Sequence, residues 1–464
     1  MSIFREYDIR GIADRDLPDS LAWALGRALA ERTKAAGDQR AYIGRDVRES
    51  SPRLSKALAA GMEAGGIECR LLAPGPSPLL YFAAYKSLPD FKTHTGLMVT
   101  ASHNPAEYNG FKMVIGGNTL HGADIQAIGG EVKQWLPSAP KTFTARATEM
   151  DRAPEYVAFL KSSIKPGRKL RVVLDGGNGA GGPLGIEAYE AIGCEVIPLF
   201  CEPDGSFPNH HPDPTVPENL KDLINKVKET KADVGIAYDG DGDRIGAVTA
   251  SGKIMFGDQL VLFYSKEILK EVPGATIISE VKSSQVLYDT LAKWGAKPII
   301  WKTGHSLIKA KLKETGAALA GEMSGHMFFA HGYLGFDDAI FAGAKLIEGV
   351  RNNVQTLDEF LASLPPTINT PELRVDCPDD LKFDLVKEFI KKARKKYPAA
   401  DILDIDGARI KTQGGWGLIR ASNTGPVLIL RFEAPNKDAL RRIRDEFASL
   451  IGEIDSAVKV PLLT

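Results

Sequence analysis

The chain has 464 residues, too many for one ordinary hydrophobic core, so we expect three or four domains. Apolar residues make up 44% and charged residues 25% of the chain, a composition typical of globular proteins that fold in water. Its 58 basic residues balance 59 acidic ones, which excludes a strong overall field towards nucleic acid or membrane, and we expect neither as a partner.

The cysteines and the first residues indicate where the protein works. The cysteines are scattered without a CxxC pair, and we expect them to be reduced. The start, MSIFREYDIRG, lacks the apolar core of a signal peptide. No run approaches the ~18 apolar residues that span a bilayer. These features together predict a cytoplasmic location.

The first part of the chain alternates strand-like and helix-like segments. AYIGRD (residues 41–46) predicts a strand, and SPRLSKALAAGMEAGG (51–66) predicts a helix that ends at glycine. The apolar runs IECRLLA (67–73) and TGLMVTA (95–101) predict two further strands. This alternation favours an α/β fold.

The same alternation begins again twice. A second unit opens near KLRVVLDGG (169–177) and continues into the helical pattern LGIEAYEAIG (184–193). A third begins with GKIMFGDQLVLFYSKEILKEV (252–272), followed by the strand-like ATIISEV (275–281) and AKPIIWK (296–302). We therefore expect three α/β units in tandem.

The segment SLPPTINTPE (363–372) holds three prolines and is the best candidate for a linker. Beyond it come a predicted helix at 379–397, several strands including VLILRFEA (427–434), and a closing helix. With boundaries near 148, 251 and 366, the expected domains are 1–147, 148–250, 251–365 and 366–464.

Ser102 lies in TASHNPAEYNGFK (100–112), a polar loop that follows the apolar run GLMV. No GxSxG turn surrounds it, so the pattern does not indicate a hydrolase nucleophile. Taken alone, a serine in such a loop is more typical of a cap or a turn.

The loop DGDGDR (239–244) carries Asp239, Asp241 and Asp243 at alternate positions, where they can aim at one point. Oxygen ligands at this density are typical of a Mg²⁺ or Ca²⁺ site. An EF-hand would place glycine and glutamate where this chain has Arg244 and Ala250, which excludes that motif. The alternative is a solvated acidic turn, which the apolar flanking runs disfavour.

A phosphorylated Ser102 would make the two loops parts of one site. Phosphoserine donates its phosphoryl group once a metal and cations neutralise the oxygens. It brings a charge of about −2, and with the three aspartates one Mg²⁺ leaves a deficit of about three charges. Arg10, Lys112 and Arg244 are the candidate compensating cations.

Two further loops could bind a sugar phosphate. In GEMSGH (321–326), Glu322 and Ser324 can hydrogen-bond sugar hydroxyls. His326 can move a proton near neutral pH, and His305 in KTGHS is a second candidate, although either histidine could be structural.

RASNTGP (420–426) is the second of these loops, a candidate phosphate-binding loop that is also typical of a tight turn. Its possible donors are Arg420, Ser422, Asn423 and Thr424.

Three other motifs have simpler interpretations. GNGAGG (177–182) matches a dinucleotide fingerprint, but no acidic residue closes a second strand about twenty positions on, so we expect a strand-to-helix turn. The adjacent histidines of NHHPDP (209–214) point apart on an extended chain, which disfavours joint metal binding. KKARKK (391–396) fits the negative end of a helix dipole better than a nucleic-acid patch.

Eight motifs in order, spanning nearly the whole chain, resemble those of the α-D-phosphohexomutase family, and particularly its bacterial phosphomannomutase/phosphoglucomutases. They are FREYDIRG, TASHNPAEYNGFK, FPNHHPDPTVPENL, DGDGDR, KTGHS, GEMSGH, GFDDA and RASNTGPVLILRFEA. The resemblance implies three tandem α/β domains with mixed sheets plus a smaller C-terminal α+β domain, around one central cleft.

The resemblance also implies a role for each candidate residue. Ser102 would be the phosphoserine and, with the three aspartates, a ligand of Mg²⁺. Glu322 and Ser324 would hold O3 and O4 of the sugar, and His305 and His326 would be candidates for proton transfer. The cations around the transferred group would be Arg10, Lys112, Arg244 and Lys282. The other phosphate would be held by Tyr7, Arg420, Ser422, Asn423 and Thr424.

The implied reaction is reversible transfer of phosphate between O6 and O1 of mannose and glucose phosphates. It passes through a hexose 1,6-bisphosphate that reverses its orientation without leaving the cleft. A site that accepts the sugar both ways round should grip a remote phosphate and two ring hydroxyls, which makes it indifferent to the configuration at C2. It should also have a mobile C-terminal domain, with 363–372 as the hinge.

Alternatives remain at this point. Gly425 is smaller than expected in the phosphate loop. GEMSGH and DGDGDR differ from the GEQSGH and DGDADR of phosphoglucosamine mutases, which favours mannose and glucose phosphates. A metal-dependent sugar phosphatase and a non-catalytic sugar-phosphate sensor are the other readings of the same loops. We expect a monomer or a weak homo-oligomer.

Overall fold

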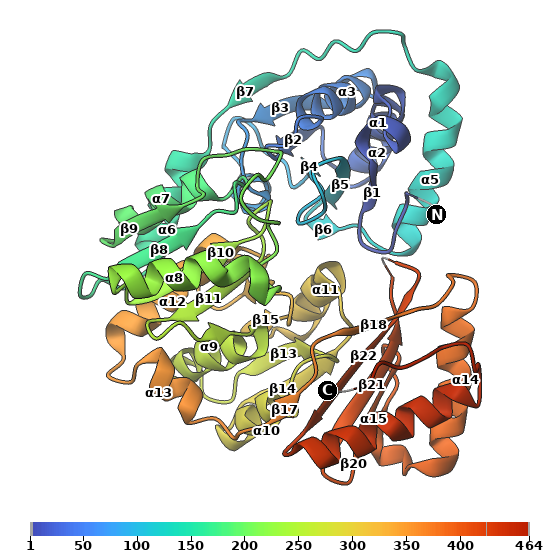
Figure 1. Ribbon diagram of the computed structural model, residues 1–464. Coiled ribbons are helices and arrows are strands. Elements are labelled where there is room, and N and C mark those ends of the chain that lie inside the picture. The colour runs from blue at the N-terminus through green and yellow to red at the C-terminus, as the bar shows by residue number, and fades with distance from the viewer. Residues whose placement is uncertain (1–2, 424, 463–464) are drawn as a thin grey trace.

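The computed structural model describes residues 3–423 and 425–462 and contains four β-sheets, which follow one another along the chain (Figure 1). The first three combine parallel and antiparallel strands with covering helices, and the fourth is antiparallel. The predicted fold class is therefore confirmed. Within the described ranges, no helix has both the length and the apolar character needed to cross a bilayer.

The first sheet has the strand order β1-β5-β4-β2-β3-β7, and β6 pairs with β5. Its central strands β4, β2 and β3 run parallel, whereas β5 is antiparallel to β4 and β1. The strands are β1 (Ile9–Ile12), β2 (Arg40–Arg45), β3 (Glu68–Leu72), β4 (Gly96–Val99), β5 (Tyr108–Ile115), β6 (Asn118–Thr119) and β7 (Thr148–Met150).

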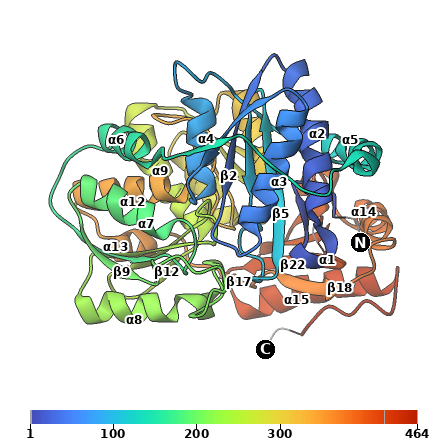
Figure 2. The same cartoon turned by 90° about the horizontal axis from the view of Figure 1, so that it is seen from above.

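Helices cover this sheet, and α2 and α3 lie side by side in both views (Figures 1 and 2). The helix predicted at 51–66 is α3, which begins at Ser51 with Pro52 in its first turn and ends before Gly65, as these residue types favour. The helices are α1 (Ala13–Asp16), α2 (Asp19–Ala35), α3 (Ser51–Ala64), α4 (Ser77–Tyr85) and α5 (Ala123–Trp135), followed by the short 3₁₀ helix η1 (Leu136–Ser138).

The second sheet has the order β12-β11-β10-β8-β9. Its strands are β8 (Arg171–Asp175), β9 (Glu195–Leu199), β10 (Val234–Tyr238), β11 (Ile245–Thr249) and β12 (Ile254–Met255). Its helices are α6 (Ala153–Ser163), α7 (Gly182–Ala191), η2 (Pro217–Leu220) and α8 (Lys221–Thr230). GNGAGG connects β8 to α7, as the predicted strand-to-helix turn.

The third sheet has the order β14-β13-β15-β16. Its strands are β13 (Thr276–Glu280), β14 (Lys297–Trp301), β15 (Leu319–Gly321) and β16 (Met327–Phe329). Its helices are α9 (Gly257–Glu271), α10 (Gln285–Lys293), α11 (His305–Thr315), α12 (Ala339–Asn352) and α13 (Leu357–Ala362).

The fourth sheet has the order β17-β22-β21-β20-β19, with β18 also on β22. KKARKK forms the last turns of α14, where Lys392 and Arg394 pair with Glu453 and Asp404. The strands are β17 (Ile368–Asn369), β18 (Leu373–Asp376), β19 (Ile402–Leu403), β20 (Ala408–Thr412), β21 (Gly415–Ala421) and β22 (Val427–Ala434). The helices are α14 (Lys382–Lys396), η3 (Ala399–Asp401) and α15 (Lys437–Gly452).

Two short strands lie just beyond the expected domain boundaries. β7 begins at 148 and extends the first sheet, and β12 lies after 250 yet pairs with β11 of the second sheet. Strands of two or three residues carry too little periodicity to be assigned to a sheet from sequence.

One hydrophobic core joins the first three sheets. Leu79 and Phe82 of α4 belong to the same buried cluster as Tyr156 of α6 and Phe341 of α12. The rings of Phe82 and Tyr156 meet edge to face, with their centroids 5.4 Å apart. The loops at the ends of these sheets are therefore held on one continuous scaffold.

The fourth sheet has a separate core, built with α14 and α15 around Phe432 and Phe447. A smaller apolar cluster joins it to the third sheet, where Val281 packs with Trp416 and Leu418. The larger of these two clusters lies entirely within the fourth domain. That domain can therefore lose its own packing without opening the core of the other three.

We expect Phe447→Ala to unfold the fourth domain selectively. Phe447 is fully buried, and its truncation costs about 3–5 kcal/mol. In hydrogen exchange read by mass spectrometry, peptides from 372–462 should lose protection while those from 153–352 keep theirs. Phe383→Ala is the matched control, because Phe383 lies in the same domain and is 48% exposed. Loss of protection throughout the chain would contradict separate cores.

Candidate active site

The loop between β4 and β5 presents Ser102 to the second domain. Ser102 has φ 51°, in the left-handed region that non-glycine residues rarely adopt, and it is 2% exposed. Its Oγ donates a hydrogen bond to Asp239 Oδ2 at 2.6 Å. The serine and the triple-aspartate loop, 137 residues apart in sequence, thus meet in a buried contact.

Arg48 holds the serine loop from beneath. Its buried guanidinium donates to the carbonyl oxygens of Ser102 (2.8 Å), Asn104 (2.7 Å), Pro105 (2.6 Å) and Tyr108 (3.0 Å). The carbonyl of Pro105 also accepts from the backbone N–H of Tyr108 at 3.0 Å, and the arginine adds a donor to each of the four carbonyls. It fixes the loop in the strained conformation that directs Ser102 at Asp239.

The loop between β10 and β11 brings three carboxylates together. Asp239, Asp241 and Asp243 are fully buried, and one oxygen from each lies within 4.8 Å of the others. The backbone N–H groups of Asp243 and Arg244 both donate to Asp239 Oδ1 at 3.1 Å. The loop therefore forms a buried, ordered cluster of carboxylate oxygens. This excludes the alternative interpretation of DGDGDR as a solvated acidic turn.

Glycine is required where this loop touches its neighbours. A Cβ at Gly240 would lie 2.4 Å from the carbonyl oxygen of Ser102. The carbonyl of Gly240 also accepts from the N–H of Ala180 at 2.9 Å, so the GNGAGG turn supports the loop from behind. The spacing of DGDGDR thus lets both loops approach within contact distance.

Lys112 of β5 supplies the nearest positive charge. Its Nζ contacts Asp241 Oδ2 at 2.6 Å and also pairs with Asp243. Burial opposes the charge on Asp243, yet Lys112 and His326 hold the pKa of this carboxyl well below its usual range. At Asp239, burial and the neighbouring carboxylates raise the pKa well above its usual range. The charge on the loop is only partly compensated.

The cluster suits a divalent metal ion. Asp241 Oδ1 and Asp243 Oδ1 are buried and accept no hydrogen bond from any residue that the structure describes. Carboxylate oxygens without donors, gathered around one point, are the ligands that Mg²⁺ prefers. The three aspartates and the Ser102 oxygen can hold such an ion.

Arg10 and Arg244 are the other expected cations. Arg10 pairs with Asp8 and donates to Asn104 of the serine loop. Arg244 follows the aspartates directly, and its Nε lies 3.3 Å from His326 Nε2. The structure thus gathers Arg10, Lys112 and Arg244 around Ser102 and its partner loop.

His326 connects the aspartate loop to GEMSGH. Its Nδ1 lies 3.0 Å from Glu322 Oε2 and 3.0 Å from Ser324 Oγ, and its Nε2 lies 3.2 Å from Asp243 Oδ1. Burial opposes the charged imidazolium, but Asp243 and Glu322 outweigh it and raise the pKa of His326 to about 9. A charged imidazole therefore sits between the metal loop and the expected sugar contacts.

His305, the first residue of α11, lies beside His326, and their ring centroids are 5.6 Å apart. Its Nδ1 lies 3.3 Å from Asp337 Oδ2, and Asp337 Oδ1 accepts from Lys309 at 2.9 Å. Burial and Lys309 lower the pKa of His305 despite Asp337. Although the two histidines are neighbours, the neutral form is therefore favoured for His305 and the charged form for His326.

The RASNTGP loop closes the ring of domains. Asn423 Nδ2 donates to the Tyr7 hydroxyl at 2.7 Å, and that hydroxyl donates to the carbonyl of Thr303 at 2.8 Å. Buried Arg420 donates to Asp406 at 3.1 Å. The first, third and fourth domains meet here. Ser422 is buried in the same loop, and Thr424 lies outside the described residues.

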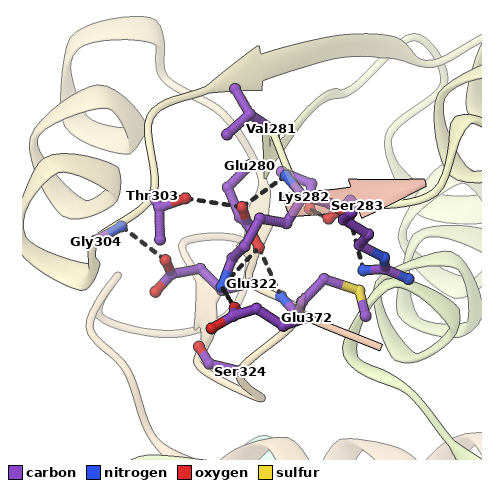
Figure 3. A network of polar contacts seen from close by, with 12 residues as sticks. Glu280, Val281, Lys282, Ser283, Thr303, Gly304, Glu322, Ser324 and Glu372 are labelled. Carbon is purple, nitrogen blue, oxygen red and sulfur yellow. Dashed lines mark hydrogen bonds and ion pairs between the residues drawn. The ribbon is translucent and has the colours of Figure 1, made fainter. Parts of the chain in front are cut away.

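Lys282 lies in a polar network beside the fourth domain (Figure 3). Its Nζ is 3.1 Å from Glu372 and 3.8 Å from Glu280, and Lys282 lowers the pKa of Glu372 to about 2 against the effect of burial. Among the described residues, no hydrogen bond or ion pair joins this network to Lys112 or Arg244. The ion pairs of Lys282 in this part of the chain are with these two glutamates.

Two arginines of the fourth domain hold the backbone around Lys282. Arg409 stacks over Trp416 at 3.7 Å and donates to the carbonyls of Val281 and Ser283, both at 2.6 Å. Arg431 donates to the carbonyl of Lys282 at 2.7 Å. The position of Lys282 thus depends on where the fourth domain docks.

Comparison with known proteins agrees with this geometry. Models of the four phosphoglucomutase/phosphomannomutase domains match residues 1–137 (domain I), 154–252 (domain II), 256–368 (domain III) and 372–450 (C-terminal domain). The chain belongs to this family. The prediction of an α-D-phosphohexomutase, an enzyme of the isomerase class, is confirmed.

Several relatives in the family are similar over their whole length. A Pseudomonas putida phosphomannomutase/phosphoglucomutase is 43% identical over 99% of this chain and 97% of its own. A family structure from Burkholderia thailandensis is 40% identical, with a TM-score of 0.91 and 99% of both chains covered. An Aspergillus fumigatus N-acetylphosphoglucosamine mutase, solved with GlcNAc-6P and magnesium, shares the fold at 12% identity, with a TM-score of 0.59 over 93% of this chain and 96% of its own.

Sequence reasoning missed Arg48, Asp337 and Arg409. Asp337 lies in GFDDA, so that motif was available as a signal. Arg48 follows the predicted strand AYIGRD, at the strand end where ligand-binding loops gather, and this position was the available signal. The role of Arg409 in holding the Lys282 turn offers no local signal, because the carbonyls to which it donates are more than 120 residues away.

We expect Arg48→Lys to slow the isomerase about 100-fold in kcat while leaving the fold intact. Lysine cannot reproduce a planar fork that reaches four carbonyls, and small misplacements of a reacting group cost this much. Steady-state kinetics and a melting curve measure the two effects. Arg53→Lys is the control, because Arg53 lies on α3 and pairs with Asp14 and Asp19 near the surface. An unchanged kcat would show that Arg48 does not position the serine.

Proposed function

We propose that this enzyme moves phosphate reversibly between O6 and O1 of mannose and glucose phosphates, through a phosphoserine at Ser102 and a hexose 1,6-bisphosphate. The observation that carries the proposal is the 2.6 Å contact between Ser102 Oγ and Asp239, inside a buried loop of three aspartates. This contact joins the serine of ASHNP to one of the two groups of buried side chains that could hold a metal ion in the described residues.

The charges around Ser102 suit a phosphoryl donor. Mg²⁺, held by Ser102, Asp239, Asp241 and Asp243, would neutralise the oxygens of the transferred group. Arg10, Lys112 and Arg244 would offset the remaining charge on that group, each without leaving the positions that the structure gives them. The serine ester can then lose its phosphoryl group and later accept another.

Proton transfer is assigned to His326. It contacts both the metal loop, through Asp243, and the expected sugar-binding carboxylate Glu322. His305 is held by Asp337 and lies beside His326, so it supports the position of the His326 ring. As the imidazolium, His326 gives a proton to the leaving sugar oxygen, and the neutral imidazole that remains takes the proton of the attacking hydroxyl in the other direction.

The sugar would be held at two kinds of group that do not depend on its orientation. Glu322 and Ser324 would bind the O3 and O4 hydroxyls. The remote phosphate would be held by Tyr7, Lys282, Arg420, Ser422, Asn423 and Thr424. Because either end of the bisphosphate presents a phosphate, the intermediate can reverse and place the second phosphate at Ser102. None of these proposed contacts distinguishes the configuration at C2, so mannose and glucose phosphates would both fit.

Reversal of the intermediate requires room, which a moving fourth domain would give. We propose the domains 1–147, 148–250, 251–365 and 366–464, with the proline-rich 363–372 as the hinge. The separate core of the fourth domain supports this division. We also propose a cytoplasmic location, where sugar phosphates are made and used.

A sugar phosphatase is the alternative from another class. It would use the same serine and metal, with water as the acceptor. The ring of contacts from Tyr7 to Asn423 and the polar network at Lys282 supply a substrate grip that water does not need. They favour the mutase.

We expect Ser102→Ala to lower the mutase rate by about 1,000-fold or more, because the phosphoryl donor is lost. A coupled assay on glucose 6-phosphate and mannose 6-phosphate measures the rate, and calorimetry should still detect binding of both sugars. Ser162→Ala, at an exposed serine of α6, should keep full activity. Substantial activity in Ser102→Ala would rule out the donor role, and release of inorganic phosphate by the wild type at the turnover rate would favour the phosphatase.

We expect Asp241→Asn to raise the Mg²⁺ concentration needed for half-maximal activity by about tenfold or more, because one carboxylate ligand is lost. Magnesium titrations of activity measure this shift. Asp222→Asn, on the exposed face of α8, should leave the titration unchanged. The same titration curve for Asp241→Asn and the wild type would remove this loop from the metal site.

A further inference from the structure

A second group of potential metal ligands lies next to the triple-aspartate loop. It consists of Asp243, His326 and Asp337, whose ligand atoms lie within 4.8 Å of one another. All three side chains are buried. They come from the β10–β11 loop, the turn before β16 and the turn before α12, so the fold gathers them from three segments.

Unpartnered atoms point into this group. Asp243 Oδ1, Asp337 Oδ2 and His305 Nδ1 are buried and make no hydrogen bond to any of the residues described. They lie around His326: Asp243 Oδ1 is 3.2 Å from His326 Nε2, and Asp337 Oδ2 is 3.3 Å from His305 Nδ1. Each of these two carboxylate oxygens faces an imidazole nitrogen at 3.2–3.3 Å without a well-aligned hydrogen bond, so a cation bound between the carboxylates and His326 could take the place of the imidazole proton.

The remaining atoms of these ligands are already held. Asp337 Oδ1 accepts from Lys309 at 2.9 Å, and His326 Nδ1 contacts Glu322 at 3.0 Å. Lys112 pairs with the other oxygen of Asp243. Contacts of this kind orient the ligands of a metal site and leave one atom of each free. The competing contact is Arg244 Nε, 3.3 Å from His326 Nε2, which a bound ion would displace.

We propose that Asp243, His326 and Asp337 form a second cation site, selective for an imidazole-binding transition metal such as Zn²⁺ or Co²⁺, with His305 as a possible fourth ligand. The imidazole distinguishes it from the oxygen-only cluster of Asp239, Asp241 and Asp243, which suits Mg²⁺. The two sites share Asp243.

Occupation of this site would inhibit the enzyme. The ion binds His326 Nε2 and takes one oxygen of Asp243, so it removes a proton-transfer group and weakens the magnesium cluster together. This consequence rests on the proposed function. The binding itself does not, and it can be measured without turnover.

The test uses Co²⁺ as the probe on the metal-free full chain. A histidine bound to Co²⁺ gives a paramagnetically shifted imidazole N–H signal in the proton NMR spectrum, and Glu322 is placed to protect the Nδ1–H of His326 from exchange. We expect this signal in the wild type and in Asp241→Asn, which keeps all three ligands of the second site. We expect its loss in Asp337→Asn and in His326→Gln, with Co²⁺ affinity lowered about tenfold or more.

The three variants separate the two sites. Circular dichroism checks that Asp337→Asn folds, and His326→Gln provides the same test if it does not. Absence of a shifted imidazole signal in the wild type would overturn the proposal. So would an unchanged signal and Co²⁺ affinity in both Asp337→Asn and His326→Gln, or loss of the signal in Asp241→Asn alone, which would place the ion at the oxygen cluster.

Discussion

The structure depends on compensating the charge of three aspartates that are fully buried in one loop. Leaving such carboxylates unpaired away from water would be strongly unfavourable, so the surrounding elements must bring cations and donors to them. β5 brings Lys112, the aspartate loop itself ends in Arg244, and the GEMSGH turn brings His326. Ser102 supplies a hydroxyl donor, which is also the phosphate carrier in the proposed reaction.

This requirement explains why the first three domains share a core. Lys112, His326 and the aspartates come from three different sheets, and contacts of 2.6–3.2 Å between them tolerate little relative movement. A common apolar cluster through α4, α6 and α12 fixes the sheets against one another. In the proposed function the fourth domain contacts the remote phosphate, and its separate core is compatible with docking and undocking. Arg409 and Arg431 of the fourth domain hydrogen-bond the backbone around Lys282, so docking of that domain also fixes the position of the lysine.

Much of this could be predicted from sequence, because the chemistry lies in short motifs at strand ends. Asp239, Asp241 and Asp243 are close in the chain, so their spacing alone predicts a cluster. Ser102 follows a strand end in another sheet, and loops at strand ends are where ligands gather, so a shared cleft could be expected. Arg48 could not be assigned, because its role is to satisfy carbonyls of a loop more than 50 residues away, and sequence does not show which carbonyls lack donors. The ion pair of Lys282 with Glu372 could not be assigned from sequence either, because these residues become neighbours only through tertiary packing. The short strands β7 and β12 likewise owe their place to pairing partners and not to their own residues.

The most direct test of the account follows one phosphate through one turnover. Enzyme labelled with radioactive phosphate at Ser102 is mixed with unlabelled glucose 6-phosphate, and samples are quenched over time. The account predicts that the label leaves the protein, appears first in glucose 1,6-bisphosphate and then in the monophosphates, without matching release of inorganic phosphate. Label that stays on the protein while product forms, or that leaves as inorganic phosphate, would contradict it.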